Sequence, residues 1–407
     1  MTRRCSISRE TIRSSPGKTG KHDTLRGMEE RSKEQSAGCS GRPRVALVHD
    51  WLNTKRGGAE HVLEVLADMF PEAPIYTLVY NPSKFHYPPE RIHTSYLQKM
   101  PDILKQRNRY LLPLIPSAIE SWDFSAYDVV ISSSSAFAKN IVTPETTRHI
   151  CYCHTPMRFV WDYWPRYLSQ QRVGPLRRAY ITRQTGKLRM WDFVGAQRVD
   201  RFLANSRTTR ERIHKFYRRK ADVIFPPVDT SSLVYTAPAG KRDYYVTLAV
   251  LTPYKKIDAA IEAFNVSGKK LTVIGDGPDR NRLQELAGDN IEFTGYISTK
   301  NKARMLTEAK GLLFPNVEDF GIAPVEAMAS GTPVIAYNAG GARETVIEGE
   351  TGIFFDQQTP AGINQAIERS ESSRFNGSTL TNRARQFSTA TFTEAIQSRV
   401  DEASHRP

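Results

Sequence analysis

Short apolar runs alternate with stretches of helical periodicity along most of this chain of 407 residues. The first run, Val45-Ala-Leu-Val48, is followed by a polar loop at 49–58 and then by apolar residues at helical spacing up to Phe70. A strand buried on both faces of a sheet reads as an unbroken apolar run, and strands that alternate with helices build parallel, doubly wound sheets. The pattern therefore predicts an α/β fold with strands at 45–48, 75–79, 129–131, 149–153, 201–204, 244–251, 271–274, 291–293, 311–314 and 334–336.

A break in this pattern at Pro226-Pro227-Val228-Asp229 predicts two domains, as the chain length also does. The charge balance changes at the same point, because residues 45–229 hold 27 Lys and Arg against 17 Asp and Glu, whereas residues 230–407 hold 19 against 21. The predicted organisation is a disordered basic tail at 1–42, a Rossmann-like domain at 43–227, a linker at 228–242, a second Rossmann-like domain at 243–375 and a helical segment at 376–407.

The tail is rich in Ser, Arg, Lys and Gly and has too few large apolar residues to order itself, and Met28 is an alternative start. Four cysteines, at 5, 39, 151 and 153, are too few for a disulfide framework and lack the spacing of a zinc site. No apolar run has the length of a membrane span or the form of a secretory signal. We therefore expect a cytoplasmic protein, with peripheral attachment to the inner face of the membrane as a second expectation.

The segment 163–220 is strongly basic, with 16 Lys and Arg against the three acids Asp192, Asp200 and Glu211. Such a stretch favours an anionic partner, which includes phosphate, an anionic membrane surface or nucleic acid, although a solvated helix face gives the same pattern. Nucleic acid is the disfavoured partner, because the aromatic residues here belong to no recognisable nucleic-acid motif. These aromatic residues are Tyr163, Trp164, Tyr167, Tyr180 and Trp191.

Two carboxylates, Glu318 and Glu326, lie around a segment that reads as the start of a helix. Pro324 suits the first helical position and Gly331 suits a helix stop, while a glycine at 321 lets the backbone approach a ligand closely. Free amides at a helix start can bind an anion or sugar hydroxyls, and carboxylates accept hydrogen bonds from the vicinal hydroxyls of a polyol. Two acids at a helix start are also explained by the helix dipole alone, so the chemistry of this segment leaves both interpretations open.

The seven residues between Glu318 and Glu326, with their Phe-Gly-Ile-Ala-Pro core, resemble the E-x7-E signature of retaining glycosyltransferases of family 4. The similarity covers about 44–356 and is strongest toward bacterial mannosyltransferases. It implies the GT-B fold, with two Rossmann-like domains facing a central cleft, the first binding the acceptor and the second the nucleotide-sugar donor. It also implies that Glu326 holds the donor ribose. Glu318 and the backbone of Phe320, Gly321 and Ile322 would contact the transferred sugar.

Other residues match positions that the resemblance connects with the donor. Gly57 and Gly58 open the first long helix, where the family's loop approaches the diphosphate, and His154 follows a strand as the family's sugar-contacting histidine does. The remaining matches are Lys255 and Lys256 for the diphosphate, Gly275 and Asp276 for a turn on the nucleotide side, and Gly340 beside the donor. Two positions depart from the family: Val250 stands where an arginine is usual, and Ser135 lies where a histidine is frequent.

The resemblance implies transfer of a hexose from a nucleoside diphosphate sugar with retention of configuration, GDP-mannose being the first candidate for the donor. His154, Glu318 and Lys255 would be the catalytic residues. The acceptor would be a glycan or a lipid-linked sugar in the synthesis of cell-envelope polysaccharide. We expect no cofactor and no metal ion, because no Asp-x-Asp site occurs in a supporting context. Two alternatives stay open: a catalytically degenerate GT-B partner protein, which Val250 and Ser135 favour, and a GT-B nucleotide-sugar epimerase.

Overall fold

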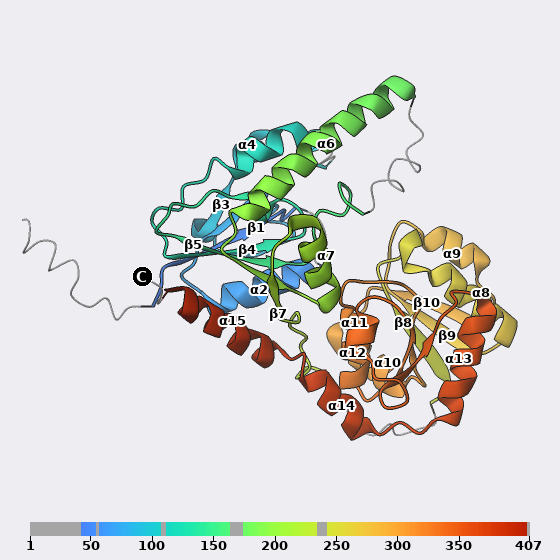
Figure 1. Ribbon diagram of the computed structural model, residues 1–407. Helices are drawn as coiled ribbons and strands as arrows, with labels where there is room; N and C mark the ends of the chain where they lie inside the picture. Colours follow the sequence, from blue (N-terminus) through green and yellow to red (C-terminus); the bar gives the residue numbers. More distant parts are fainter. Residues whose placement is uncertain (1–41, 54–56, 107–110, 163–173, 234–241, 405–407) are drawn as a thin grey trace, which may run out of the picture. The chain divides into compact units, whose positions relative to one another are not determined.

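A computed structural model of the chain describes residues 42–53, 57–106, 111–162, 174–233 and 242–404 (Figure 1). The predicted basic tail lies outside the described residues except for Arg42, and so does the part of the predicted linker at 234–241. The aromatic residues Tyr163, Trp164 and Tyr167 of the basic segment also lie outside them.

Seven parallel strands form the first sheet, in the order β3-β2-β1-β4-β5-β6-β7. Their bounds are β1 Val45–His49, β2 Ile75–Thr77, β3 Ile92–Thr94, β4 Val129–Ser134, β5 Arg148–Cys153, β6 Arg201–Ala204 and β7 Ala221–Val223. The α-helices of this part are α2 Gly58–Met69, α3 Asp102–Gln106, α4 Ile115–Ile119, α6 Pro175–Gln197 and α7 Arg207–Tyr217. Short 3-10 helices lie at Pro89–Arg91, Tyr96–Lys99, Leu112–Leu114 and Ala138–Asn140. The strand order reverses between β1 and β4, as it does in a doubly wound sheet.

Six parallel strands form the second sheet, in the order β10-β9-β8-β11-β12-β13. Their bounds are β8 Tyr244–Leu248, β9 Lys270–Ile274, β10 Ile291–Gly295, β11 Leu312–Phe314, β12 Val334–Tyr337 and β13 Gly352–Phe355. Between and after them come the 3-10 helix Pro253–Lys255 and the α-helices α8 Ile257–Ser267, α9 Arg280–Leu286, α10 Thr299–Glu308, α11 Ile322–Ala329, α12 Ala342–Thr345 and α13 Pro360–Ser372. The predicted α/β class with parallel, doubly wound sheets is confirmed.

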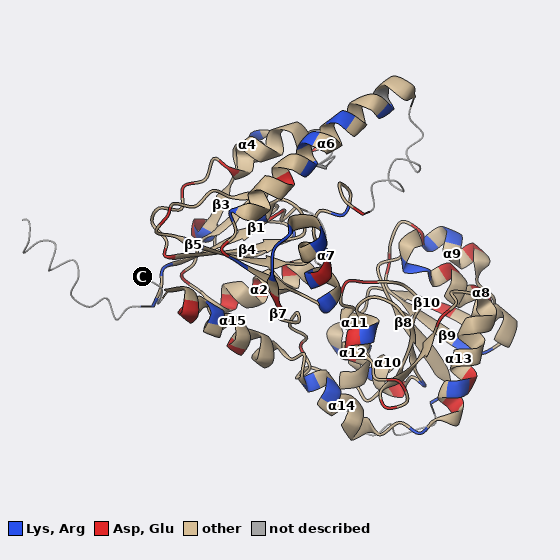
Figure 2. Ribbon diagram, in the orientation of Figure 1, with Lys and Arg blue, Asp and Glu red and all other residues tan. Residues whose placement is uncertain are grey.

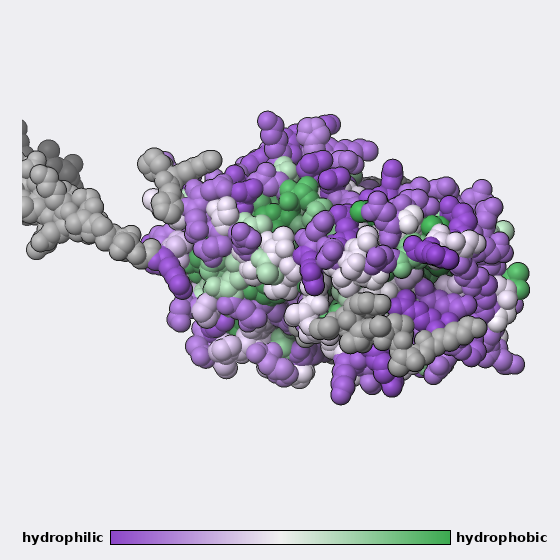
Figure 3. Space-filling model, turned by 90° about the horizontal axis from the view of Figure 1, so that it is seen from below, coloured by the Kyte–Doolittle hydropathy of each residue, from purple (hydrophilic) through white to green (hydrophobic). Residues whose placement is uncertain are grey.

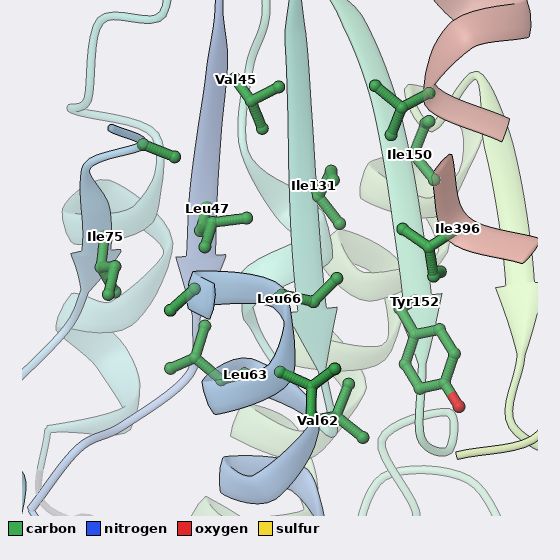
Figure 4. Close-up of a cluster of buried hydrophobic side chains, with 14 of the residues drawn as sticks. Val45, Leu47, Val62, Leu63, Leu66, Ile75, Ile131, Ile150, Tyr152 and Ile396 are labelled. Carbon is green, nitrogen blue, oxygen red and sulfur yellow. The ribbon is translucent and has the colours of Figure 1, made fainter. Parts of the chain in front are cut away.

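Each sheet has an apolar core on both of its faces, because alternate residues of a strand point to opposite sides. In β1, Val45 and Leu47 enter one core, while Ala46 and Val48 enter the other. Figure 4 shows the first of these cores, where the labelled residues of α2 pack against the sheet residues Leu47 and Ile131. The second sheet is likewise covered by α8 and α13 on one face and by α10 and α11 on the other.

The last two helices of the chain pack in different places. Helix α14, Gly377–Arg385, packs on α11 of the second sheet. Helix α15, Thr389–Ser404, packs on α2 and β4 of the first sheet, and it appears beside α2 in Figure 1. Its residues Phe392, Ile396 and Val400 are buried in the same core as α2. The chain therefore returns to the first sheet after completing the second, which the sequence pattern left open.

Polar and charged residues cover most of the face drawn in Figure 3, with apolar residues reaching the surface in places. In the part of the chain that the structure describes, every helix is either too short or too polar to cross a bilayer.

Candidate donor site

The predicted donor residues of the second sheet lie in loops at the carboxyl ends of its strands. Lys255 follows β8, Gly275 and Asp276 follow β9, Glu318 follows β11 and Gly340 follows β12. Strands β9, β8, β11 and β12 are successive neighbours in this sheet. The carboxyl edge of a parallel sheet is where ligands of α/β proteins bind, so the topology gathers residues that are up to 85 positions apart in the sequence.

Glu318 and Lys255 form an ion pair through Oε1 and Nζ, and both side chains are largely buried. Asn316 donates a hydrogen bond from Nδ2 to the same carboxylate oxygen, over 2.9 Å. The Lys255 ammonium also lies 5.2 Å from the centre of the Tyr254 ring. The sequence predicted Lys255 and Glu318 as separate contacts of the donor, and the structure brings them together as one charged pair.

The backbone around Glu318 is closely packed against two glycines. The amide of Gly341 donates to the carbonyl of Glu318 over 2.9 Å. Gly340 has φ +63°, and a Cβ atom there would lie 2.5 Å from the Glu318 carbonyl oxygen. A Cβ atom at Gly341 would lie 2.1 Å from the carbonyl oxygen of Phe320. Only glycine fits this contact, so the loop after β12 fixes the path of the loop that carries Glu318.

Helix α11 begins at Ile322, with Gly321 as its N-cap residue at φ +88°. Pro324 is therefore the third helical residue and not the first, so this prediction was wrong. Proline is still tolerated there because the first amides of a helix have no partner inside the helix. The side chain of Phe320 is buried against Phe225 and Phe387, which leaves only its backbone to meet a ligand. The chain stops being helical after Ala329, two residues before Gly331 with φ +69°.

Glu326 lies on α11 and accepts a hydrogen bond from Lys302 of α10, with 2.6 Å between Nζ and Oε1. Both side chains are mostly buried. The second carboxylate of the predicted signature is thus also paired with a lysine. A hydroxyl pair of a ligand could bind Glu326 through its remaining lone pairs, because an ionised carboxylate accepts at both oxygens.

The turns after β8 and β9 are also held by backbone contacts. Lys256 adopts the left-handed conformation, with φ 56° and ψ 32°, at the start of α8. Gly275 has φ +129°, and its Cβ position lies 2.0 Å from the carbonyl oxygen of Ala249. The carboxylate of Asp276 accepts the amide of Gly277 over 2.7 Å and lies 3.8 Å from the guanidinium of Arg280. Asp276 is thus used in its own turn, as an Asp-Gly pair often is.

Val250 lies in the loop between β8 and Lys255, and 49% of its surface is exposed. No charge occupies the position where the family resemblance leads one to expect an arginine.

His154 lies at the carboxyl end of β5 in the first sheet, with 9% of its surface exposed. Its Nε2 lies 2.8 Å from Ser133 Oγ, and Ser133 Oγ lies 3.2 Å from His49 Nδ1. The strand register explains this contact, since His49 of β1 stands directly beside Ser133 of β4. The Ser132–Ser134 run is thus part of a buried strand.

Burial keeps the ring of His154 neutral. Loss of hydration and the neighbouring His49 ring lower its pKa to about 3, against a smaller opposite effect of Glu60. His149, which hydrogen-bonds Ser132 over 2.8 Å, is fully buried, and burial with the nearby charges of Arg198 and Lys139 lowers its pKa to about 3 as well. A neutral imidazole carries one N–H and one lone pair, so His154 can act as a hydrogen-bond partner without bringing a charge.

Gly57 and Gly58 stand at the start of α2. The amide of Gly57 donates to Glu60 Oε2 over 2.9 Å, so the Glu60 side chain satisfies one free amide at this helix start. A Cβ atom at Gly58 would lie 3.1 Å from Cδ1 of Ile322, so the glycine allows the start of α2 to approach the start of α11. Helix α7 makes two other long-range contacts: Arg212 pairs with Asp319, and Glu344 of α12 accepts the amides of Arg207 and Thr208 at the start of α7.

Among the described residues, no group of three or more His, Cys, Asp or Glu side chains is arranged to hold a metal ion. A pocket opens at the opposite, amino edge of the second sheet, lined in part by Tyr245, Lys310 and Glu371. None of the donor residues predicted from the sequence lines it.

Each half of the chain matches a model of a protein family. The model described as "Glycosyltransferase Family 4" matches residues 56–232, and the model "Glycosyl transferases group 1" matches residues 235–390. The chain belongs to glycosyltransferase family 4. Its members are transferase enzymes, so the predicted family and enzyme class are confirmed.

Relatives of this family 4 chain include mannosyltransferases. A GDP-mannose-dependent alpha-(1-6)-phosphatidylinositol monomannoside mannosyltransferase from Mycobacterium tuberculosis is 33% identical over 146 residues, which cover 31% of this chain and 38% of that protein. An alpha-1,3/1,6-mannosyltransferase from Neurospora crassa is 48% identical over 70 residues, 16% of this chain and 15% of that protein. The chain thus matches less than half the length of these relatives.

Solved structures show the same fold over nearly the whole of the described chain. A sucrose-phosphate synthase from Thermosynechococcus elongatus covers 88% of this chain and 99% of its own, with a TM-score of 0.67 and 17% identity. HepE from Anabaena was solved in complex with UDP-glucose. The match covers 88% of this chain and 99% of HepE, with a TM-score of 0.61 and 18% identity. At such identities the likeness concerns the fold, and the predicted GT-B fold of this family 4 chain is confirmed.

Several residues of the site were missed by the sequence reasoning. They are Asn316 and Lys302, which contact the two signature carboxylates, Glu60 and His49 near His154, and Asp50. The buried carboxylate of Asp50 accepts the backbone amides of Ser135, Ala136, Phe137 and Ala138 over 2.6–2.9 Å, and so holds the turn after β4. A carboxylate directly after the apolar run at 45–48 was the available signal for Asp50; nothing in the spacing pointed to the others.

Proposed function

We propose that this chain transfers a hexose, with mannose as the first candidate, from a nucleoside diphosphate sugar to a glycan or lipid-linked acceptor with retention of configuration. The observation that carries the proposal is the Lys255–Glu318 pair at the carboxyl edge of the second sheet, with Glu326 on helix α11, which follows the Glu318 loop. These residues combine a cation for a diphosphate with two carboxylates for hydroxyls. The mannosyl donor is supported by the mycobacterial relative, whose name specifies GDP-mannose. The cell-envelope role is an extension of the lipid-linked acceptor named there.

In the proposed reaction, the bond between the anomeric carbon and the diphosphate oxygen breaks first and leaves an oxocarbenium-like centre. Lys255 stabilises the negative charge that develops on the departing diphosphate, which is the kind of preorganised electrostatic effect that contributes most to many enzymes. The acceptor hydroxyl attacks the same face of the sugar and gives its proton to the departing phosphate oxygen. No side chain acts as a covalent nucleophile, and neither a metal ion nor a cofactor is part of the proposal.

Glu318 and Glu326 would have different tasks in this reaction. Glu326 accepts hydrogen bonds from the hydroxyls of the donor ribose, and its hydrogen bond from Lys302 orients the carboxylate. Glu318 binds hydroxyls of the transferred sugar while its pairing with Lys255 sets the position of the ammonium group. His154 contributes a neutral hydrogen-bond partner for the sugar. Gly57, Gly58 and the backbone of Gly321, Ile322 and Gly340 allow the close approach that a diphosphate sugar needs.

The acceptor would be bound through the first sheet and its helices, and an anionic membrane surface is the proposed location of a lipid-linked acceptor. Helix α6 supports this part of the proposal. Its exposed residues include Leu176, Tyr180, Met190 and Val194 together with the cations Arg178, Arg183 and Lys187. Lys and Arg recur along this helix in Figure 2, and no acidic residue occurs from 175 to 191. Cations that flank exposed apolar residues suit binding at the surface of anionic lipids.

The donor part of the proposal is tested by calorimetric titration of the purified chain with GDP-mannose and with the corresponding UDP and ADP sugars. We expect saturable binding of GDP-mannose and a loss of affinity of at least about tenfold in Glu326→Ala, because one or two hydrogen bonds to a charged group are removed. Glu368→Ala is the matched control, since Glu368 is an exposed acid on α13 of the same sheet. Equal affinity of the Glu326→Ala variant and the wild type would reject the assigned site.

A second candidate function is donor binding without turnover, in a degenerate partner protein. The exposed Val250 favours it, because the leaving group would lack one of its two expected cations. The two candidates separate when the titrated mixture is analysed for free nucleoside diphosphate: release points to the transferase, and intact donor after prolonged incubation with acceptor lipids points to the partner protein. An epimerase would instead convert the donor to a second nucleotide sugar.

A further inference from the structure

Four side chains form a continuous row inside the first sheet, from the start of α2 to His154. Glu60 Oε1 lies 3.9 Å from His49 Nε2, His49 Nδ1 lies 3.2 Å from Ser133 Oγ, and Ser133 Oγ lies 2.8 Å from His154 Nε2. Both His49 and Ser133 are buried, and the Glu60 side chain is largely so. The middle of the row, at His49 and Ser133, therefore has little access to water.

When both rings are neutral, the row admits two arrangements of its protons. In the first, His49 carries its proton on Nε2, its Nδ1 accepts the hydroxyl proton of Ser133, and Ser133 Oγ accepts the N–H of His154 at Nε2. The second arrangement reverses every bond: His49 donates from Nδ1 to Ser133, Ser133 donates to His154 Nε2, and the N–H of His154 moves to Nδ1. Distances alone fit both, because a hydroxyl both donates and accepts and a neutral imidazole has either tautomer.

The carboxylate of Glu60 favours one of the two proton arrangements over the other. In the first arrangement it faces the N–H of His49, and in the second it faces a ring lone pair. A distance of 3.9 Å is too long for a hydrogen bond, but a negative charge in a poorly hydrated place still favours the nearby proton. Burial opposes the ionisation of Glu60, yet its contacts with the His49 ring and with the backbone at Gly57 and Glu60 hold the pKa of its carboxyl below the ordinary value. Glu60 is therefore charged at neutral pH.

We propose that Glu60 is a positioning residue that acts through His49 and Ser133 to hold His154 in the tautomer with its proton on Nε2. His154 then presents the lone pair of Nδ1, and no hydrogen bond from Nδ1 to the described residues is found. A lone pair in this position accepts a hydrogen bond from a sugar hydroxyl. This inference rests on the proposed function in one respect: the proposal that His154 contacts the transferred sugar.

A carboxamide at position 60 is expected to reverse the direction of each hydrogen bond in the row. Glu60 Oε2 accepts the Gly57 amide over 2.9 Å, so the side chain introduced by Glu60→Gln would keep its oxygen there and turn its NH₂ group toward His49 Nε2. His49 would then accept at Nε2 and donate from Nδ1 to Ser133. Ser133 would donate to His154 Nε2, and the proton of His154 would move to Nδ1. The variant differs from the wild type by one group of the same shape, and the hydrogen bond from the Gly57 amide is retained.

The experiment is nitrogen-15 NMR of the full chain labelled at its nine histidines, in which long-range couplings from ring carbon protons distinguish the two tautomers. The resonances of His154 are assigned from a His154→Gln spectrum. We expect the Nε2–H form in the wild type, the Nδ1–H form in Glu60→Gln, and a mixture in Ser133→Ala, where the link to His49 is lost. Glu64→Gln is the matched control, because Glu64 lies one turn later on α2 and 3.5 Å from His61, outside the row.

An Nδ1–H form in the wild type, or an unchanged tautomer in Glu60→Gln, would overturn the inference. If Glu60→Gln fails to fold, judged by circular dichroism, the inference is tested by the tautomer of His154 in Ser133→Ala.

In the transfer assay we expect kcat of Glu60→Gln to fall on the order of tenfold, as for the loss of one hydrogen bond, with kcat of Glu64→Gln unchanged. The NMR result does not depend on turnover. A chain without transferase activity would therefore refute the proposed function and leave the tautomer result standing, and normal turnover with an unchanged tautomer would refute only this inference.

Discussion

The two signature carboxylates form ion pairs with lysines, whereas the buried histidines form hydrogen bonds with neutral hydroxyl groups. Glu318 pairs with Lys255 and Glu326 pairs with Lys302, whereas His154 and His149 share hydrogen bonds with serine hydroxyls. An ionised group is stable in a half-buried place when it is paired, and an imidazole is stable there when it is neutral. These side chains therefore have favourable partners in the folded chain without ligand, and the same side chains are the proposed contacts of the donor.

The two neutral histidines predict how stability depends on pH. Their pKa values of about 3 lie below the ordinary value, so the unfolded chain binds more protons than the folded chain between about pH 6.5 and pH 3. Stability should thus be level above that window and fall as the pH decreases through it. Each ring contributes up to about 1.4 kcal/mol per pH unit. Urea unfolding at pH 7.5 and 5.5 measures the effect, and His154→Gln should weaken the dependence while His86→Gln, at an exposed ring, should not.

Gly341 is a residue where a single added methyl group is expected to lower stability. The Cβ atom of Gly341→Ala would lie 2.1–2.4 Å from backbone atoms of Phe320, which cannot move without shifting the loop that carries Glu318. We expect a loss of about 1–3 kcal/mol in the free energy of unfolding, measured with urea. Gly174→Ala is the control, because nothing lies within 4 Å of its Cβ position. Equal stability of the two variants would contradict the close packing of the loops after β11 and β12.

At the scale of elements, helices α11 and α6 show how differently two helices of one chain can be used. Helix α11 is short, apolar and mostly buried, and it carries Glu326, which pairs with Lys302 of α10. Helix α6 has 23 residues and a largely exposed surface, apart from residues such as Leu188 and Asp192, which are buried. Asp192 there accepts hydrogen bonds from Trp161 and Tyr217 and pairs with the buried Lys139. The buried side of α6 thus anchors the helix, and the exposed side is free for another role.

The exposed side of α6 predicts binding to anionic vesicles. Reversal of two charges in Arg183→Glu with Lys187→Glu should reduce sedimentation with phosphatidylserine-containing vesicles several-fold, since each cation near such a surface contributes about 1 kcal/mol. The matched control is Lys300→Glu with Arg304→Glu, which reverses two exposed cations on α10. Binding of the wild type should weaken in high salt. If both double variants bind as the wild type does, the proposed contact of α6 with the membrane is wrong.

For the whole molecule, the sequence predicted the central strands far better than the edge strands. The strand at 201–204 agrees at both ends, and β4 continues past the predicted 129–131 as far as Ser134. Strands β3, β7 and β13 were missed, and all three are short strands at or near a sheet edge. Such strands need no unbroken apolar run, because one side lacks a partner strand; β3 and β7 are only partly buried.

The site was predictable where its residues are neighbours in sequence and not where the fold brings them together. Glu318 and Glu326 belong to one local motif, so the spacing was enough to find them. Lys302 approaches Glu326 from another helix, and His49 meets Ser133 only through the register of β1 and β4. Contacts of this kind depend on packing between distant segments, which single-sequence patterns do not contain. The predicted domain boundaries, the donor and the acceptor likewise stay predictions.

The most direct test of the proposed donor site is the release of GDP when the purified chain is incubated with GDP-mannose and a lipid extract from the cells that produce it. Wild-type chain and Lys300→Ala should release GDP at the same rate, and Lys255→Ala should be slower by about 10²–10³-fold, because the charge on the departing diphosphate loses its cation. Circular dichroism confirms that each variant is folded. GDP release at the wild-type rate by Lys255→Ala, or release from another nucleotide sugar and none from GDP-mannose, would contradict the proposed donor site or the proposed donor, respectively.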